Sequence, residues 1–152
     1  MAKRIYFDMD GTVYDLYGVN DWLNKLETAD VTAYTLGKPL VNLKELEKVC
    51  KALIANGYEI GVITWLCKGG SEKFNNETTA VKREWVNKNM PYVTEFTAQT
   101  YGTPKQKAVG RNVKFAVLVD DNDEVREMWN TPKQRKSIDA KLDIITKLWE
   151  LV

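Results

Sequence analysis

The alternation of strand-like and helix-like segments is the feature that most constrains the fold of this chain. Short apolar runs predict buried strands at residues 3–8, 58–64 and 114–120, the last two rich in Val and Ile. An alternating pattern predicts a further strand at residues 92–98. Apolar residues spaced three and four apart predict helices at residues 43–56, 79–89, 124–129 and 138–151. Such alternation favours an α/β fold of three-layer, Rossmann-like type, with a mostly parallel sheet and helices on both faces.

Two connections are longer than those of compact α/β domains usually are, at residues 14–40 and 65–78. Long connections at strand ends tend to be functional. The first contains the aromatic residues Tyr14, Tyr17, Trp22 and Tyr34. These side chains would either cover a ligand or pack the insertion against the body of the protein, and the two roles are compatible. We expect a single domain over residues 1–152, with residues 14–40 as a small lid.

Composition excludes several kinds of chemistry. The chain has no histidine, which excludes His-ligated zinc and Ser-His-Asp or Cys-His catalysis. Cys50 and Cys67 are isolated, which suits a reducing compartment and offers no metal motif. Lys and Arg number 22 against 21 for Asp and Glu, so net charge indicates neither nucleic acid nor membrane. We expect a cytoplasmic monomer or homodimer with no membrane segment and no signal peptide.

Polar side chains gather where the predicted strands end. Asp8 and Asp10 follow the first strand and Thr64 ends the second. Asp120 and Asp121 end the strand at 114–120. Ligands of parallel sheets bind beyond the carboxyl ends of the strands, so these groups would share one crevice. Carboxylates from separate strands suit Mg²⁺, and a carboxylate beside Mg²⁺ can accept a phosphoryl group.

Two lysines stand in the loop "YGTPKQKAVG" at residues 101–110, before the last of these strands. An ammonium in this loop would hold phosphate oxygens and offset charge in the transition state. We prefer Lys107 for this role because it stands just before Ala108 and Val109, where a helix would begin. Lys105 is then either a second anion contact or an exposed side chain.

Four short motifs, in order along the chain, resemble those of the haloacid dehalogenase (HAD) superfamily. They are "DMDGT" at 8–12, the threonine ending "VIT" at 62–64, "TPKQK" at 103–107 and "VLVDDND" at 117–123. The first motif is specific, and the other three are weak when taken alone. Each also has a purely structural interpretation, as a turn, a strand-end hydroxyl, solvated lysines or a helix N-cap. Their shared order frames most of the chain and implies the HAD version of the Rossmann-like fold.

The resemblance implies a Mg²⁺-dependent phosphomonoesterase that works through an aspartyl-phosphate. Asp8 would be the nucleophile and a metal ligand. Asp10 would be the general acid and base, and its backbone carbonyl would also bind the metal. Phosphatases of this superfamily have an acid at that position, whereas its dehalogenases lack one. Thr64 and Lys107 would hold the phosphoryl group.

The remaining motif residues receive supporting roles from the same resemblance. Asp120 would complete the metal site, with Asp121 beside it as a direct or water-mediated ligand. Gly11 and Thr12 would shape the turn that receives the substrate's phosphate. Mg²⁺ is the only cofactor that the resemblance implies.

A further resemblance, to the 5′(3′)-deoxyribonucleotidase branch of the superfamily, narrows the expected class of substrate. In that branch aromatic residues of the cap stack on a base. Tyr14, Tyr17 and Trp22 would supply the stacking here, and Trp65 directly follows Thr64. We expect a nucleotide with a 5′ or 3′ monophosphate, or the phosphorylated end of a nucleic acid. The alternatives are a phosphatase or phosphotransferase for a sugar or other small phosphate ester, and a catalytically idle binding module. A receiver domain ranks low, because its acid pair would come early in the chain.

Overall fold

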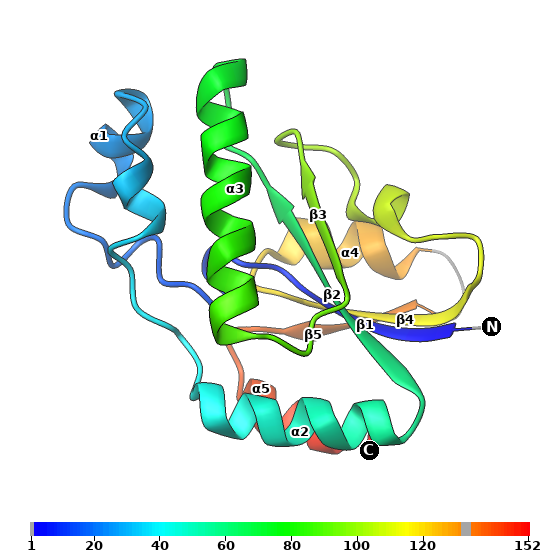
Figure 1. Ribbon diagram of the computed structural model, residues 1–152. Coiled ribbons are helices and arrows are strands. Elements are labelled where there is room, and N and C mark those ends of the chain that lie inside the picture. The colour runs from blue at the N-terminus through cyan, green and yellow to red at the C-terminus, as the bar shows by residue number, and fades with distance from the viewer. Residues whose placement is uncertain (1, 132–134) are drawn as a thin grey trace.

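A five-stranded sheet, all of whose strands run parallel, forms the centre of the computed structural model, which describes residues 2–131 and 135–152 (Figure 1). The spatial order is β3-β2-β1-β4-β5. The strands are β1 (Ala2–Phe7), β2 (Tyr58–Trp65), β3 (Glu95–Gln99), β4 (Val113–Asp120) and β5 (Arg135–Asp139). The expected α/β class and parallel sheet are confirmed.

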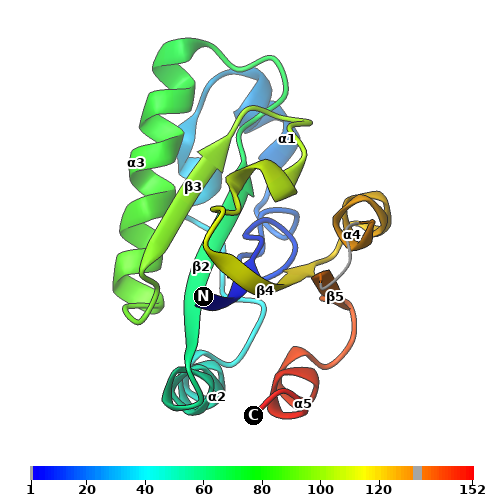
Figure 2. The ribbon, with the colours of Figure 1, turned by 90° about the vertical axis from the view of Figure 1, so that its right-hand side faces the viewer.

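Helices cover both faces of this sheet (Figure 2). On one face, α2 (Leu43–Ala55), α3 (Glu72–Asn89) and α5 (Ile144–Trp149) pack over a large apolar core that includes Ile5 and Phe7 of β1. On the other face lies α4 (Asp123–Asn130), where the Trp129 ring meets Tyr6 of β1 edge-on, with centroids 5.9 Å apart. Side chains on both faces of β1 are thus buried, which explains its nearly continuous apolar sequence.

The order of the strands creates a crevice at one point of the sheet. After β1 the chain adds β2 and β3 on one side, and it then crosses to place β4 and β5 on the other. In open parallel sheets ligands bind at such a switch, beyond the carboxyl ends of the strands. Asp8 directly follows β1, and Asp120 ends β4. The topology therefore brings these two acids to one edge of the sheet.

Capping residues explain where the first two long helices begin. The Asn42 side chain accepts hydrogen bonds from the backbone of Lys44 and Glu45, and α2 begins at Leu43 as predicted. Ser71 accepts from the backbone of Phe74, so α3 begins at Glu72 rather than at residue 79. The second half of the predicted long connection at 65–78 is therefore helix.

The predicted helix at 138–151 is wrong in its first part. Residues 135–139 form β5, in which Ile138 pairs with Val119 of β4. The helix α5 begins only at Ile144, after Asp143 accepts a hydrogen bond from the backbone of Thr146. The spacing of three and four arose because Ile138 of the strand and Leu142 of the turn precede the apolar residues of the helix at matching intervals.

Residues 14–40 pack mainly against α3. They contain α1 (Trp22–Glu27) and the single 3₁₀ turn η1 (Val31–Tyr34), which lie beside α3 in Figure 1. A small apolar cluster joins this segment to Phe74 of α3, and α1 itself contributes no fully buried side chain. In the part of the chain that the structure describes, no helix has the length and apolarity needed to cross a bilayer.

Candidate active site

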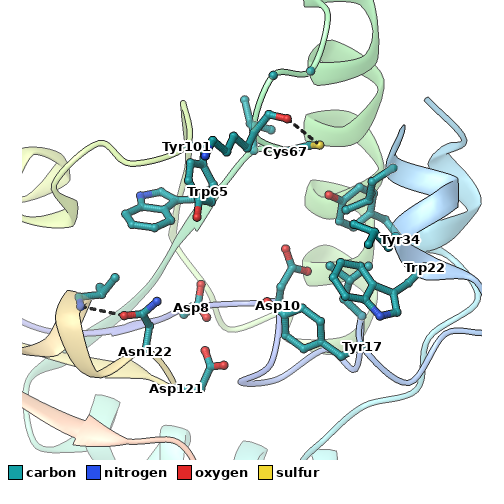
Figure 3. A pocket seen from close by; sticks show the side chains of 18 of the residues that line it. Asp8, Asp10, Tyr17, Trp22, Tyr34, Trp65, Cys67, Tyr101, Asp121 and Asn122 are labelled. Atoms are coloured by element: carbon teal, nitrogen blue, oxygen red, sulfur yellow. Dashed lines mark hydrogen bonds between the residues drawn. The ribbon is translucent and has the colours of Figure 1, made fainter. Parts of the chain in front are cut away.

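A cavity of about 540 Å³ opens at the carboxyl ends of the central strands (Figure 3). Its volume is in the range of small-molecule sites. Carboxylates form its base, and aromatic side chains stand on two opposite sides of them (Figure 3). The charged residues that the argument uses are Asp8, Asp10, Asp120, Asp121 and Lys105, and the aromatic ones are Tyr17, Trp22, Tyr34, Trp65 and Tyr101.

The turn after β1 connects the two halves of the acidic base. Gly11 has φ +82°, and a Cβ there would lie 2.4 Å from Oδ2 of Asp121. Both the backbone conformation and the contact require glycine. Thr12 donates its hydroxyl to Asp8 Oδ2 at 3.0 Å and lies 3.4 Å from Asp121 Oδ1. The turn therefore sets the acid of β1 against the acid that follows β4.

Three carboxylates form a cluster that can hold a metal ion. Asp8, Asp120 and Asp121 each offer an oxygen, and these oxygens all lie within 4.8 Å of one another. The buried Lys105 donates to Asp8 Oδ1 and to Asp120 Oδ2, at 2.7 Å each. Three ionised carboxylates and one ammonium leave two negative charges in excess. Hard oxygen ligands with that excess fit a divalent cation.

The ionisation of the cluster reflects this excess of negative charge. Burial, together with the charges of Asp8 and Asp120, raises the pKa of Asp121 to about 7. Burial likewise raises the pKa of Asp120. For Lys105 burial acts in the opposite direction, but the two carboxylates outweigh it and raise the pKa of the ammonium. The lysine therefore stays charged while the acids resist complete ionisation.

Asp10 belongs to a second group, built around a lysine that the sequence analysis did not select. Lys82 of α3 donates to Asp10 Oδ2 at 2.9 Å, to Thr64 Oγ1 at 2.8 Å and to the Trp65 carbonyl at 2.9 Å. Its ammonium also lies 4.7 Å from the ring centre of Tyr34. Burial raises the pKa of Asp10, although Lys82 opposes the shift.

Thr64 lies beneath the cavity rather than in its wall. Its side chain is fully buried, and it is not among the residues that line the cavity. Its hydroxyl oxygen accepts from Lys82 instead. The structure thus brings Thr64 to Asp10 through Lys82, and the predicted direct contact with substrate is not what this arrangement provides.

The expectation that Lys107 faces the acids is wrong, and Lys105 takes that place. The predicted helix after this loop is a single 3₁₀ turn, η2 (Lys105–Ala108), which turns Lys105 inward and leaves Lys107 exposed. The loop is held from outside itself, because the Trp65 indole donates to the carbonyl of Thr103 at 2.8 Å. This long-range contact ties the start of the loop to the end of β2.

The aromatic residues divide between cavity and core. Tyr17 and Trp22 line the cavity as an edge-to-face pair with ring centres 5.0 Å apart. Trp65 stands on the opposite side, with its ring centre 5.1 Å from that of Tyr101 (Figure 3). Tyr14 does not reach the cavity: it is buried, and its hydroxyl donates to the Ala33 carbonyl at 2.7 Å. Tyr14 therefore anchors the segment at 14–40.

Lys82 and Tyr101 of the site were missed, and Lys82 had a signal in the sequence. Four residues spaced by four form a buried stripe on α3: Phe74, Thr78, Lys82 and Val86. Lys82 is four residues before Val86, so the two side chains lie on the same face of the helix, and this spacing indicates that the lysine points into the protein. Tyr34, which was expected either to cover a ligand or to pack the insertion, lines the cavity and is buried. Nothing in the sequence distinguishes Tyr101 from other loop residues.

A scan against models of protein families finds no match, and a search of curated proteins finds none either. The chemistry of the site is therefore the basis on which a function can be argued.

Proposed function

We propose that the protein is a Mg²⁺-dependent phosphomonoesterase of the HAD type, with Asp8 as its nucleophile. The observation that carries this proposal is the ammonium of Lys105, which lies 2.7 Å from both Asp8 and Asp120 inside the three-carboxylate cluster. Phosphoryl transfer to a carboxylate needs cationic groups beside the nucleophile to offset the charge of the phosphoryl oxygens. Mg²⁺ held by Asp8, Asp120 and Asp121 would supply further positive charge when bound.

The side chains support a two-step reaction. A carboxylate oxygen of Asp8 bonds to phosphorus as the ester P–O bond breaks, and the leaving oxygen takes a proton from Asp10. A water molecule then attacks the phosphorus of the aspartyl-phosphate and gives a proton to Asp10. Inorganic phosphate leaves, and the Asp8 carboxylate is restored. A raised pKa of Asp10 supports its role as the acid of the first step.

The walls of the cavity favour a nucleoside monophosphate as substrate. Tyr17 and Trp22 on one side and Trp65 on the other offer faces on which a base would stack (Figure 3). Among the described residues that line the cavity, only Lys68 and Lys105 are cationic, and Lys105 is engaged with the acids. A nucleic-acid end would need cationic contacts to its further phosphates. The single nucleotide is therefore preferred over the polymer end.

A panel of phosphate esters, assayed with Mg²⁺ or with EDTA, tests this function. We expect phosphate release from nucleoside monophosphates with Mg²⁺, weaker release from phosphorylated oligonucleotide ends and sugar phosphates, and none with EDTA. Asp8→Asn should abolish release, a loss of at least about 10³-fold. Wild-type turnover in Asp8→Asn would exclude the aspartyl-phosphate. Metal binding without turnover of any ester would favour the idle binding module.

A further inference from the structure

We propose that Lys82 is a positioning residue that orients Asp10 for proton transfer, and that Thr64 acts on Asp10 through Lys82 instead of touching the phosphoryl group. The inference rests on the proposed function, because it concerns the acid–base step of that reaction. It assigns a role to a lysine outside all four motifs.

The hydrogen bonds of Lys82 fix its ammonium in space. A lysine ammonium has three donors and no acceptor. Those of Lys82 meet three oxygens at 2.8–2.9 Å, two of them on the end of β2 and one on Asp10. The side chain is 2 % exposed, so water does not compete for these donors. The ring of Tyr34, 3 % exposed, covers the ammonium from the segment at 14–40.

The same hydrogen bonds fix the orientation of the Asp10 carboxylate. Oδ2 accepts from Lys82, whereas Oδ1 is buried and finds no hydrogen-bond partner among residues 2–131 and 135–152. A buried carboxylate oxygen without a partner is costly unless a ligand supplies one. Asp10 lines the cavity, with its carboxylate beside that of Asp8 in Figure 3. The Asp10 carboxylate, held by Lys82 at Oδ2, is thus placed at the cavity to exchange a proton with the leaving group and with water.

Thr64 and the Trp65 carbonyl are the fixed points of this arrangement. Both belong to β2, a strand buried at the centre of the sheet. The Thr64 oxygen accepts from Lys82 and lies outside the cavity wall. The two oxygens of β2 therefore hold the Lys82 ammonium in place, and the ammonium in turn holds the Asp10 carboxylate.

Leaving groups that differ in their need for a proton provide the test. A nucleoside monophosphate expels an alkoxide, which needs the proton of Asp10, whereas para-nitrophenyl phosphate expels a stable phenolate. The measurement is single-turnover release of the leaving group at saturating ester and Mg²⁺, so that the shared hydrolysis step does not mask the difference. Lys82→Met should slow release from the nucleotide about 10²-fold or more, and release of the phenolate less than about tenfold. Thr64→Val should show the same selectivity with a smaller loss.

Control variants separate positioning from folding. Lys88→Met makes the same substitution at an exposed position of α3 and should leave both rates unchanged. Lys82→Arg keeps a positive charge beside Asp10, but its planar guanidinium does not reproduce three converging donors. We expect it to fold and to show the selective loss even where Lys82→Met does not fold. Thermal unfolding of each variant reports whether the protein remains native.

Each outcome decides the inference. Equal losses on the two esters in folded Lys82 variants would assign Lys82 a merely structural role and overturn the proposal. Equal losses in Thr64→Val would overturn the part that concerns Thr64. A wild-type protein that releases neither leaving group would overturn the proposed function and this inference with it. An active wild type with unselective variants would overturn the inference alone.

Discussion

Two buried lysines organise opposite sides of one cavity, and they differ in what they balance. Lys105 lies among three carboxylates, so its neighbourhood keeps an excess of negative charge. Lys82 meets one carboxylate and two uncharged oxygens, so its group carries no excess of negative charge and all three of its donors are used. The first group could hold a metal ion, whereas the second offers a cation a single carboxylate. The difference separates a candidate metal site from a group that holds one acid in place.

The largest effect is expected where the charge excess is greatest. Lys105→Met removes the partner of two buried acids, and it should lower the free energy of unfolding in EDTA by about 3–5 kcal/mol. Denaturant unfolding measures this. Mg²⁺ should restore much of the loss, because the cation replaces the missing charge. Lys107→Met, two residues away and exposed, should change neither quantity. A loss that Mg²⁺ leaves untouched would contradict the assignment of the metal site.

Lys82→Met should have the next largest effect on stability, and Mg²⁺ should not reverse it. The substitution removes a charge-assisted hydrogen bond to Asp10 and two further hydrogen bonds, at a cost of about 1.5–3 kcal/mol. Unfolding in EDTA and in Mg²⁺ should show the same loss. Recovery in Mg²⁺ would mean that both lysines belong to one electrostatic unit, and the comparison between them would fail.

The aromatic residues allow a second comparison, between Trp22, which lines the cavity, and Tyr14, which is buried in the core. Trp22→Ala should raise KM for a nucleoside monophosphate by about 5- to 100-fold, the equivalent of about 1–3 kcal/mol of stacking, with little effect on para-nitrophenyl phosphate. Tyr14→Phe removes a buried hydrogen bond and should lower stability without this change in KM. Equal KM effects of Trp22→Ala on the two esters would count against base stacking.

The dependence of the metal site on pH is a small effect for each pH unit. Without metal, Asp121 has a pKa of about 7 in the folded protein against 3.8 as its ordinary value. Ionising a group whose folded pKa is raised costs stability, so stability in EDTA should fall as pH rises from about 4 to about 7. Mg²⁺ displaces the proton, and its affinity should therefore rise by up to about tenfold per pH unit until pH 7. Calorimetry should find this slope reduced in Asp121→Asn.

The fold could be predicted where local sequence and burial agree. The strands β1, β2 and β4 are buried on both faces, and their continuous apolar runs indicated them directly. The start of helix α2 could be predicted from the capping residue Asn42. By contrast, β5 is short and partly exposed, and the spacing from Ile138 onward imitated a helix. Local patterns do not distinguish these two states in so short a segment.

The candidate site was predictable where the topology alone places residues. Asp8 and Asp120 follow adjacent parallel strands, so their meeting follows from the sheet. Lys105 and Lys107 lie two residues apart on a 3₁₀ turn, and Lys105 points inward whereas Lys107 is exposed. Tyr14 and Tyr17 differ only in which side of a short segment they occupy. Such choices depend on tertiary contacts that a single sequence does not display.

Trapping of the covalent intermediate tests the central claim most directly. Asp10→Asn should slow hydrolysis of the aspartyl-phosphate, so the protein, quenched in acid during turnover of para-nitrophenyl phosphate, should retain a phosphoryl group. Borohydride reduction releases that group as phosphate and leaves homoserine where the aspartyl-phosphate stood. Mass spectrometry of the tryptic peptide 5–25 should therefore find homoserine in place of Asp8 after turnover in Mg²⁺ and none in EDTA. An active enzyme that never carries phosphate on Asp8, or one that carries it on another residue, would contradict the account.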